Sequence, residues 1–314
     1  MIELIKNRSD IGAGTRGADM GIDAMEIAAI NSGDDYFNCH NYIDVLTHNE
    51  SIYNKFTSSV AKRIENVYQQ CERVSTAVTS VYKRGRFPIV LSGDHSSALG
   101  TIAGIKFAYP SSTLGVIWLD AHSDIHSPYT SPSGNVHGMP LAAALQKDNL
   151  INKINEVDED AKYYWQKMKT LCGDNAKLNP QNLIYLGLRD FEKAEMNLIE
   201  ELGIANYSVP YVRSTGITKI VDECLNKLKA TDIIYISFDV DSMDCEAISY
   251  GTGTPVPTGF YMEEIMQIFD GLIASKKVKC IEFAEINPLL DNKGNRMAET
   301  AFQVLSHISK LIEQ

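Results

Sequence analysis

Short apolar runs that end in an acid or a histidine are the feature that most constrains the fold of this 314-residue chain. Helical patterns separate these runs, and such an alternation is typical of a parallel sheet with helices on both faces. Strands of this kind read as continuous apolar stretches because neither face meets water. The predicted strands are "PIVLSGD" (88–94), "LGVIWLD" (114–120), "NLIYLGLRD" (182–190), "DIIYISFDVD" (232–241) and "KVKCIEFAEINP" (278–288).

The alternation predicts an α/β fold: a three-layer α/β/α sandwich with a mostly parallel central sheet. The length fits one large domain and no stretch resembles a linker, so we expect a single domain over 1–314. A long helix is expected over 51–85, where apolar residues recur at steps of three and four and Gly85 supplies a stop. The polar segment 148–180 is expected to be a surface excursion, with one helix near Lys162–Lys169.

The composition excludes several classes of partner. A net charge of −11 argues against a phosphate-binding surface, so we expect no nucleic acid partner. Six scattered cysteines without a C-x-x-C pair indicate reduced thiols rather than a zinc ribbon or a redox motif. The first ten residues lack the apolar core of a signal peptide, and no run approaches the length of a membrane span. The sequence therefore predicts a cytoplasmic protein without membrane contact.

Acids and histidines gather where the predicted strands end, which is where ligands bind in open α/β sheets. Extended backbone turns residues i, i+2 and i+4 to one face, so Asp120, His122 and Asp124 are expected to converge, as are Asp239 and Asp241. Carboxylates packed together repel one another unless cations neutralise them. Mixed imidazole and carboxylate ligands suit first-row divalent metals, with manganese favoured over zinc.

None of these motifs is specific by itself, because exposed strand ends often carry Asp and His. The hypothesis depends on their combination, with Asp94 and His95 after one strand, the acids above after two others and Glu285 after a fourth. A different motif, "GAGTRG" at 12–17, matches the G-x-G-x-x-G of dinucleotide-binding folds. That fingerprint should follow a strand directly, whereas "KNRSD" intervenes here, so a glycine-rich turn near the cleft is the favoured interpretation.

Taken together, six motifs resemble the ureohydrolase family, and arginases most of all. They are "SGDHS", "DAHSD", "SPSGNVHGMPLA", "SFDVDSMD", "GTGTPV" and "EINP", and the likeness spans nearly the whole chain. The resemblance implies a three-layer α/β/α fold, a dimanganese centre and a small-molecule guanidino substrate from which urea or a related product is released. It also implies a homo-oligomer, since the family is commonly trimeric or hexameric.

Carried over by motif, the resemblance implies two Mn²⁺ per chain at six positions. It places one ion on His95, Asp120, Asp124 and Asp239, and the other on Asp120, His122, Asp239 and Asp241. The two aspartates common to both sets would bridge. Two metals lower the pKa of a bridging water, so that hydroxide is available near neutral pH to attack the guanidinium carbon.

The resemblance also implies catalytic roles for three residues. Asp124 would accept a hydrogen bond from the hydroxide, and Glu285 would orient the guanidinium through charge-assisted hydrogen bonds. His137 is the expected shuttle that protonates the leaving amine. Outside this context, His137 would read as an ordinary histidine of a surface loop.

Substrate recognition is expected from a further set of residues. The loop "SPSGNVHG" contacts the α-carboxylate in arginases, although as a string it is equally typical of a plain turn. The two glutamates of "LRDFEKAE" match acidic positions near the α-ammonium, or they are solvated acids at a helix start. The expected substrate-binding residues are His126, Ser131, Ser133, Asn135, Glu192, Glu195 and Thr254.

Two of these positions depart from the arginase pattern. His126 stands where arginases usually have an Asn, and Glu192 replaces a customary Asp. The first hypothesis is therefore an arginase that converts L-arginine to L-ornithine and urea. The second is a relative that acts on agmatine, guanidinobutyrate or formiminoglutamate. The third is a non-catalytic metal-binding or assembly subunit, which would not need the complete ligand set together with His137 and Glu285.

Overall fold

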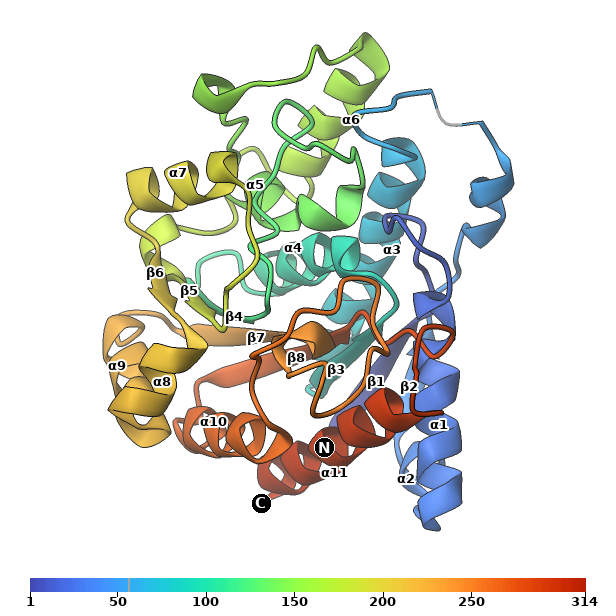
Figure 1. The fold of residues 1–314 in the computed structure, drawn as a ribbon, viewed down its shortest axis with the longest axis vertical. Helices are drawn as coiled ribbons and strands as arrows, with labels where there is room; N and C mark the ends of the chain where they lie inside the picture. Colours follow the sequence, from blue (N-terminus) through green and yellow to red (C-terminus); the bar gives the residue numbers. More distant parts are fainter. Residues whose placement is uncertain (56) are drawn as a thin grey trace.

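The computed structural model describes residues 1–55 and 57–314. Within them, eight strands form one parallel sheet in the order β2-β1-β3-β8-β7-β4-β5-β6 (Figure 1). The strands are β1 (Ile2–Asn7), β2 (Asn41–Asp44), β3 (Phe87–Ser92), β4 (Leu114–Leu119), β5 (Leu183–Leu186), β6 (Ala205–Tyr207), β7 (Ile233–Asp239) and β8 (Val278–Ala284).

Helices cover both faces of the sheet, so the predicted three-layer α/β/α sandwich is confirmed (Figure 1). One apolar cluster lies between the sheet and α1, α8, α9, α10 and α11, and a second lies between the sheet and α3 to α7. The helices are α1 (Gly21–Ser32), α2 (Tyr36–Cys39), α3 (Ile64–Lys83), α4 (Ala98–Ala108), α5 (Pro140–Ala144), α6 (Glu159–Lys169), α7 (Lys193–Leu202), α8 (Val209–Thr215), α9 (Ile217–Lys227), α10 (Met262–Ala274) and α11 (Arg296–Glu313).

All five predicted strands are present, and each ends before its predicted boundary because the chain turns there into a loop. The inner strand β1 was not predicted. Its apolar run is interrupted by Glu3 and Lys6, which are nevertheless buried. Arg84 lies 2.6 Å from Glu3 and Glu26 lies 2.7 Å from Lys6, so each buried charge has an opposite partner.

The helix expected over 51–85 ends as predicted but begins later, since α3 starts at Ile64. Phe56 lies outside the described residues. The segment before α3 packs against a distant loop, where the Lys62 backbone N–H donates to Gly134 O at 2.8 Å. A Cβ on Gly134 would lie 2.0 Å from Ser59 O, so the two backbones touch. This tertiary contact overrides the helical periodicity.

The face of the sheet that α3 to α7 cover is closely packed, because α3 and α4 approach one another at glycines. A Cβ on Gly100 would lie 2.6 Å from Cys71 O, and one on Gly104 would lie 2.7 Å from Ser75 O.

The interpretation of 148–180 as a surface excursion was wrong in part. Helix α6 buries Trp165, whose indole N–H donates to Asp148 at 2.7 Å. Among the described residues, no helix has both the length and the apolar character needed to cross a membrane.

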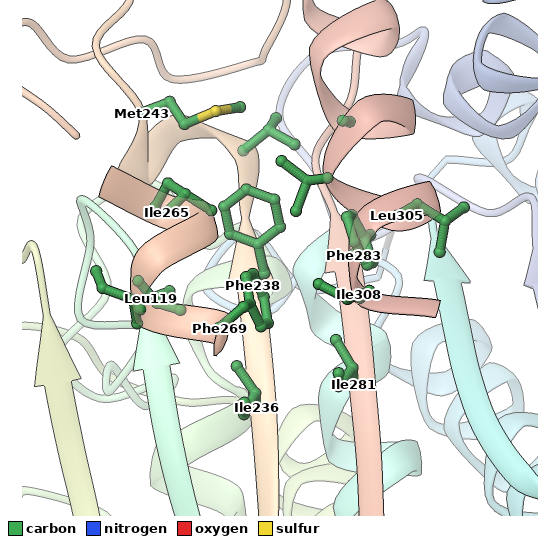
Figure 2. Close-up of a cluster of buried hydrophobic side chains, with 14 of the residues drawn as sticks. Leu119, Ile236, Phe238, Met243, Ile265, Phe269, Ile281, Phe283, Leu305 and Ile308 are labelled. Atoms are coloured by element: carbon green, nitrogen blue, oxygen red, sulfur yellow. The ribbon is translucent and has the colours of Figure 1, made fainter. Parts of the chain in front are cut away.

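On the face of the sheet that α1 and α8 to α11 cover, aromatic side chains pack between the central strands and α10 (Figure 2). The ring of Phe238 on β7 meets that of Phe269 on α10 edge to face, with centroids 5.7 Å apart, and that of Phe283 on β8 at 5.2 Å. All three rings are buried. Since β7 and β8 carry site residues at their ends, this packing holds the floor of the site in place.

Removing one of these rings should be costly. Phe269→Ala deletes a fully buried ring and leaves a cavity, so we expect it to lower the free energy of unfolding by about 3–5 kcal/mol. Phe107→Ala is the matched control, because that ring is 59% exposed and its loss should cost no more than about 0.5 kcal/mol. Denaturant unfolding of both variants measures the difference, and equal losses would contradict the packing described.

Candidate metal centre and active site

The four central strands of the sheet deliver side chains to one place. Strands β3, β8, β7 and β4 are successive neighbours, and their carboxyl ends lie at the same edge. The 3-10 turns η3 (His95–Ser97) and η7 (Val240–Ser242) follow closely after β3 and β7. The residues brought to this edge are His95 after β3, Glu285 after β8, Asp239 and Asp241 from β7 and η7, and Asp120, His122 and Asp124 after β4.

A first cluster forms around the imidazole of His95. Its Nδ1 lies 3.1 Å from Asp120 Oδ2, 3.0 Å from Asp124 Oδ2 and 3.1 Å from Asp239 Oδ2. All four residues are buried. Three carboxylate oxygens therefore gather around one ring nitrogen, and the ligand atoms of His95, Asp120 and Asp239 lie close enough together to hold one metal ion.

A second cluster shares one residue with the first. His122 Nδ1 lies 2.9 Å from Asp241 Oδ2 and 3.6 Å from Asp120 Oδ1. The two oxygens of Asp120 thus face different clusters, which is the arrangement that a bridging carboxylate needs. Thr254 Oγ1 donates to Asp241 Oδ2 at 3.1 Å and holds that carboxylate in place.

The donor set fits divalent cations. His95 Nδ1 and Asp120 Oδ2 are buried and have no hydrogen-bond partner, so their lone pairs are available to a cation. Burial, and then the charges of Asp241 and Asp120, raise the pKa of Asp239 well above its usual range. Burial and the charge of Asp120 likewise raise the pKa of Asp124 to about 6. A bound cation would relieve this repulsion.

The predicted convergence of Asp120, His122 and Asp124 is observed, but the predicted cause was wrong. Strand β4 ends at Leu119, and Asp124 has a φ of 49°, so the backbone is not extended through these residues. A turn aims the side chains instead, with the His122 N–H donating to Asp120 Oδ1 at 2.6 Å. Glu285 also has a positive φ, of 66°. Such conformations are strained in non-glycine residues and often occur at functional sites.

Glu285 and His137 form a pair beside the two clusters. His137 Nδ1 lies 3.0 Å from Glu285 Oε1, which also accepts the His95 backbone N–H at 3.0 Å. Burial alone would lower the pKa of His137, but the carboxylates of Glu285, Asp124 and Asp94 together outweigh burial and raise this pKa to about 9. The imidazole is therefore charged at neutral pH.

The site opens into a cleft of about 140 Å³ whose lining includes every predicted site residue except Asp120, which lies beneath it. The loop 131–135 forms one wall and is braced internally. Ser131 Oγ accepts the Gly134 N–H at 2.9 Å, and Ser133 Oγ accepts the Asn135 N–H at 3.2 Å. Lys62 donates to Asn135 Oδ1 at 3.2 Å, so the segment before α3 also supports this wall.

The cleft lining also holds a third group of ionisable side chains. His126 Nε2 lies 3.0 Å from Glu192 Oε2 and 3.5 Å from Glu195 Oε2, while its Nδ1 lies 3.0 Å from Thr130 Oγ1. Glu192 is the N-cap of α7 and forms a capping box with Glu195. The two glutamates are therefore acids at a helix start, and they also face the cleft.

Sequence reasoning missed Trp118, which supports the site. The Trp118 ring stacks on the His95 ring, with centroids 4.2 Å apart and planes 10° apart. The "GAGTRG" segment forms a turn beside the cleft, as the sequence indicated, because Asp94 accepts the Gly12 N–H at 2.7 Å and Gly12 O accepts the His137 N–H at 3.1 Å. Trp118 stands two residues before Asp120, and this spacing was the available signal.

Comparisons with known proteins agree with this geometry. A family model described as "Arginase family" matches residues 3–309. The chain is 33% identical over 311 residues to an arginase of Bacillus subtilis and 32% identical over 310 residues to one of Bacillus caldovelox, covering 98% of this chain and 97% of each relative. A crystal structure of the Bacillus caldovelox arginase superposes with a TM-score of 0.83 over 98% of this chain and 97% of that one.

The match covers nearly the whole chain, which includes the strand ends that carry the two clusters. The identity exceeds 30% over almost the full length of both proteins. The resemblance indicated by the six sequence motifs is thereby confirmed. This chain belongs to the arginase family, a family of metal-dependent hydrolases of the ureohydrolase class.

Proposed function

We propose that the protein hydrolyses L-arginine to L-ornithine and urea with two Mn²⁺ ions per chain. The observation that carries the proposal is the pair of His and Asp clusters joined by Asp120, with His137 and Glu285 beside them in one cleft. The similarity to arginases over the whole chain supports the same reaction. The carboxylate-rich donor set supports manganese over zinc.

The two clusters define which residues would hold the ions. The first would use His95, Asp124 and one oxygen of Asp120, and the second would use His122 and the other oxygen of Asp120. Asp239 and Asp241 complete the two sets. Divalent ions held by these residues would make hydroxide available near neutral pH by lowering the pKa of water.

The remaining side chains act on the substrate. The Glu285 carboxylate faces the cleft and would accept hydrogen bonds from the guanidinium, whose charge and planar shape suit it. Asp124, buried at the cleft floor, would hold the attacking group by accepting its hydrogen bond. His137 carries a proton at neutral pH and would donate it to the departing amine, which is too basic to leave as an anion.

The cleft walls would recognise the far end of L-arginine. Ser131, Ser133 and Asn135 offer neutral hydrogen-bonding groups to the α-carboxylate, and Glu192 and Glu195 offer negative charge to the α-ammonium. Thr254 would contribute to the inner wall. By family resemblance, we further propose one catalytic domain over 1–314 in a cytoplasmic homo-oligomer, a trimer or a hexamer.

One observation favours a second candidate function, the hydrolysis of another guanidino or formimino compound. His126 replaces the usual Asn, and both of its ring nitrogens already face partners, Thr130 and Glu192. An imidazole engaged on both sides has little capacity left for a substrate carboxylate. A substrate with a different far end, such as agmatine, would not need that contact.

A urea-release assay with manganese separates the candidates. We expect rapid urea release from L-arginine and slower release from agmatine and guanidinobutyrate. Hydrolysis of formiminoglutamate would release formamide instead of urea, so it is followed by glutamate formation, and we expect none. Elemental analysis of the same protein should give about two manganese ions per chain. Faster turnover of another compound would replace the arginine assignment, and metal binding without any turnover would point to the non-catalytic subunit.

The role of His137 predicts a pH effect. His137→Asn should lower kcat about 10²- to 10⁴-fold and leave the manganese content unchanged. Because the raised pKa keeps the imidazole protonated below about 9, proton donation fails as the pH rises through that value. The wild type should therefore lose activity above pH 9, and the variant should lack this decline. His307→Asn, on α11 at the exposed contact with Asp270, is the control and should match the wild type.

The recognition loop predicts a change of specificity. Ser133→Ala combined with Asn135→Ala should raise KM for L-arginine by at least about 10-fold, since hydrogen bonds to charged groups contribute about 1.5–3 kcal/mol each. Agmatine has no carboxylate, so its KM should not change. Ser214→Ala, on the exposed part of α8, is the control. Equal effects on the two substrates would show that this loop does not contact the carboxylate.

A further inference from the structure

A buried carboxylate lies behind the metal centre and takes no part in the mechanism above. Glu282 on β8 is fully buried. Ser92 on β3 donates to its Oε1 at 2.7 Å, and Tyr235 on β7 donates to its Oε2 at 2.7 Å. A charged group at such depth is costly unless it is well hydrogen-bonded, so its placement calls for an explanation.

Hydrogen bonds connect this carboxylate to the first cluster. Tyr235 Oη lies 3.1 Å from Ser237 Oγ, and Ser237 Oγ lies 2.7 Å from His95 Nε2. Ser237 and Tyr235 are fully buried on β7. A continuous chain of four polar groups therefore runs from Glu282 to the ring nitrogen of His95 that faces away from the aspartates.

The number of available protons decides which group donates in each of these hydrogen bonds. The Tyr235 phenol has a single proton. Tyr235 donates it to the Glu282 carboxylate, because that hydrogen bond is shorter than the contact with Ser237. Ser237 must then donate its proton to Tyr235 Oη, which leaves a lone pair of Ser237 Oγ to accept from His95 Nε2. A neutral His95 ring therefore carries its proton on Nε2 and a lone pair on Nδ1.

That lone pair points at the cluster, since Nδ1 is the atom within 3.1 Å of three aspartate oxygens. We propose that Glu282 is a positioning residue, which fixes the tautomer and orientation of His95 through Tyr235 and Ser237 so that Nδ1 is presented to a divalent cation. Stacking of the ring on Trp118 restricts the same rotation. The inference rests on the metal centre of the proposed function.

The charge state of Glu282 is consistent with this role. Burial raises the pKa of Glu282, and hydrogen bonds from Tyr235 and Ser92 limit this rise. Two hydroxyl donors, each 2.7 Å from a carboxylate oxygen, favour the ionised form over the neutral acid. Partners that fix the tautomer of a metal-binding histidine strengthen metal affinity, typically by about 10- to 100-fold.

The test compares two hydroxyls that bond to the same carboxylate. Tyr235→Phe removes the hydroxyl that connects Glu282 to His95. Ser92→Ala removes the other hydrogen bond of Glu282 and leaves the hydrogen bonds toward His95 in place. In calorimetric titrations of the metal-free full chain with MnCl₂, we expect Tyr235→Phe to weaken one of two binding events by about 10- to 100-fold. Ser92→Ala should bind both ions as the wild type does.

A spectroscopic readout separates positioning from lost stability. In chains with ¹⁵N-labelled histidine loaded with Zn²⁺ as a diamagnetic probe, the wild-type His95 ring should show a protonated Nε2 and a metal-bound Nδ1. Glu282→Gln supplies an amide that can donate, so this assignment should weaken or become mixed. If Tyr235→Phe does not fold, Ser237→Ala cuts the same chain one bond closer to the ring, with the same expected result.

The outcomes distinguish this inference from the proposed function. Equal manganese affinities for Tyr235→Phe and Ser92→Ala would overturn the role of Glu282, while the metal centre would stand. A wild-type chain that binds no manganese would overturn the proposed function and this inference together. An unchanged tautomer in Glu282→Gln would show that Trp118 and Ser237 suffice to orient His95.

Discussion

Repulsion between buried carboxylates is the constraint on which the rest of the structure depends. Asp120, Asp124, Asp239 and Asp241 are all buried within two small clusters, and two imidazoles, those of His95 and His122, lie among them. Such a cluster costs free energy that the surrounding fold must supply. The closely packed helices on both faces and the aromatic contacts under β7 and β8 provide the rigidity that keeps these acids together.

The sequence predicted the layers, the central strands and the site residues because their signals are local. An apolar run of five to seven residues indicates a buried strand, and the parallel arrangement brings strand ends to one edge whatever loops lie between. Hence His95, Asp120 and Asp239 could be grouped without knowledge of the loop geometry. The bends that aim them could not be predicted, since Asp124 adopts a positive φ that ordinary residues avoid.

The remaining differences come from contacts between distant segments. The start of α3 depends on a backbone bond from Lys62 to Gly134, and strand β1 depends on charge pairs that cancel Glu3 and Lys6. Glu282 gave no sequence signal either, because a charge within an apolar run normally points to solvent. Each of these features is decided by a partner that is far away in the sequence.

Strand order has a consequence for how the protein is made. Strand β8 is synthesised after the other seven strands of the described sheet, yet it lies between β3 and β7 at the centre of that sheet. Until it arrives, β3 and β7 have no bond between them, and Glu285 is absent from the site. Closure of the sheet and completion of the site are therefore a single late event. A chain that stops before β8 has neither the closed sheet nor the complete set of site residues.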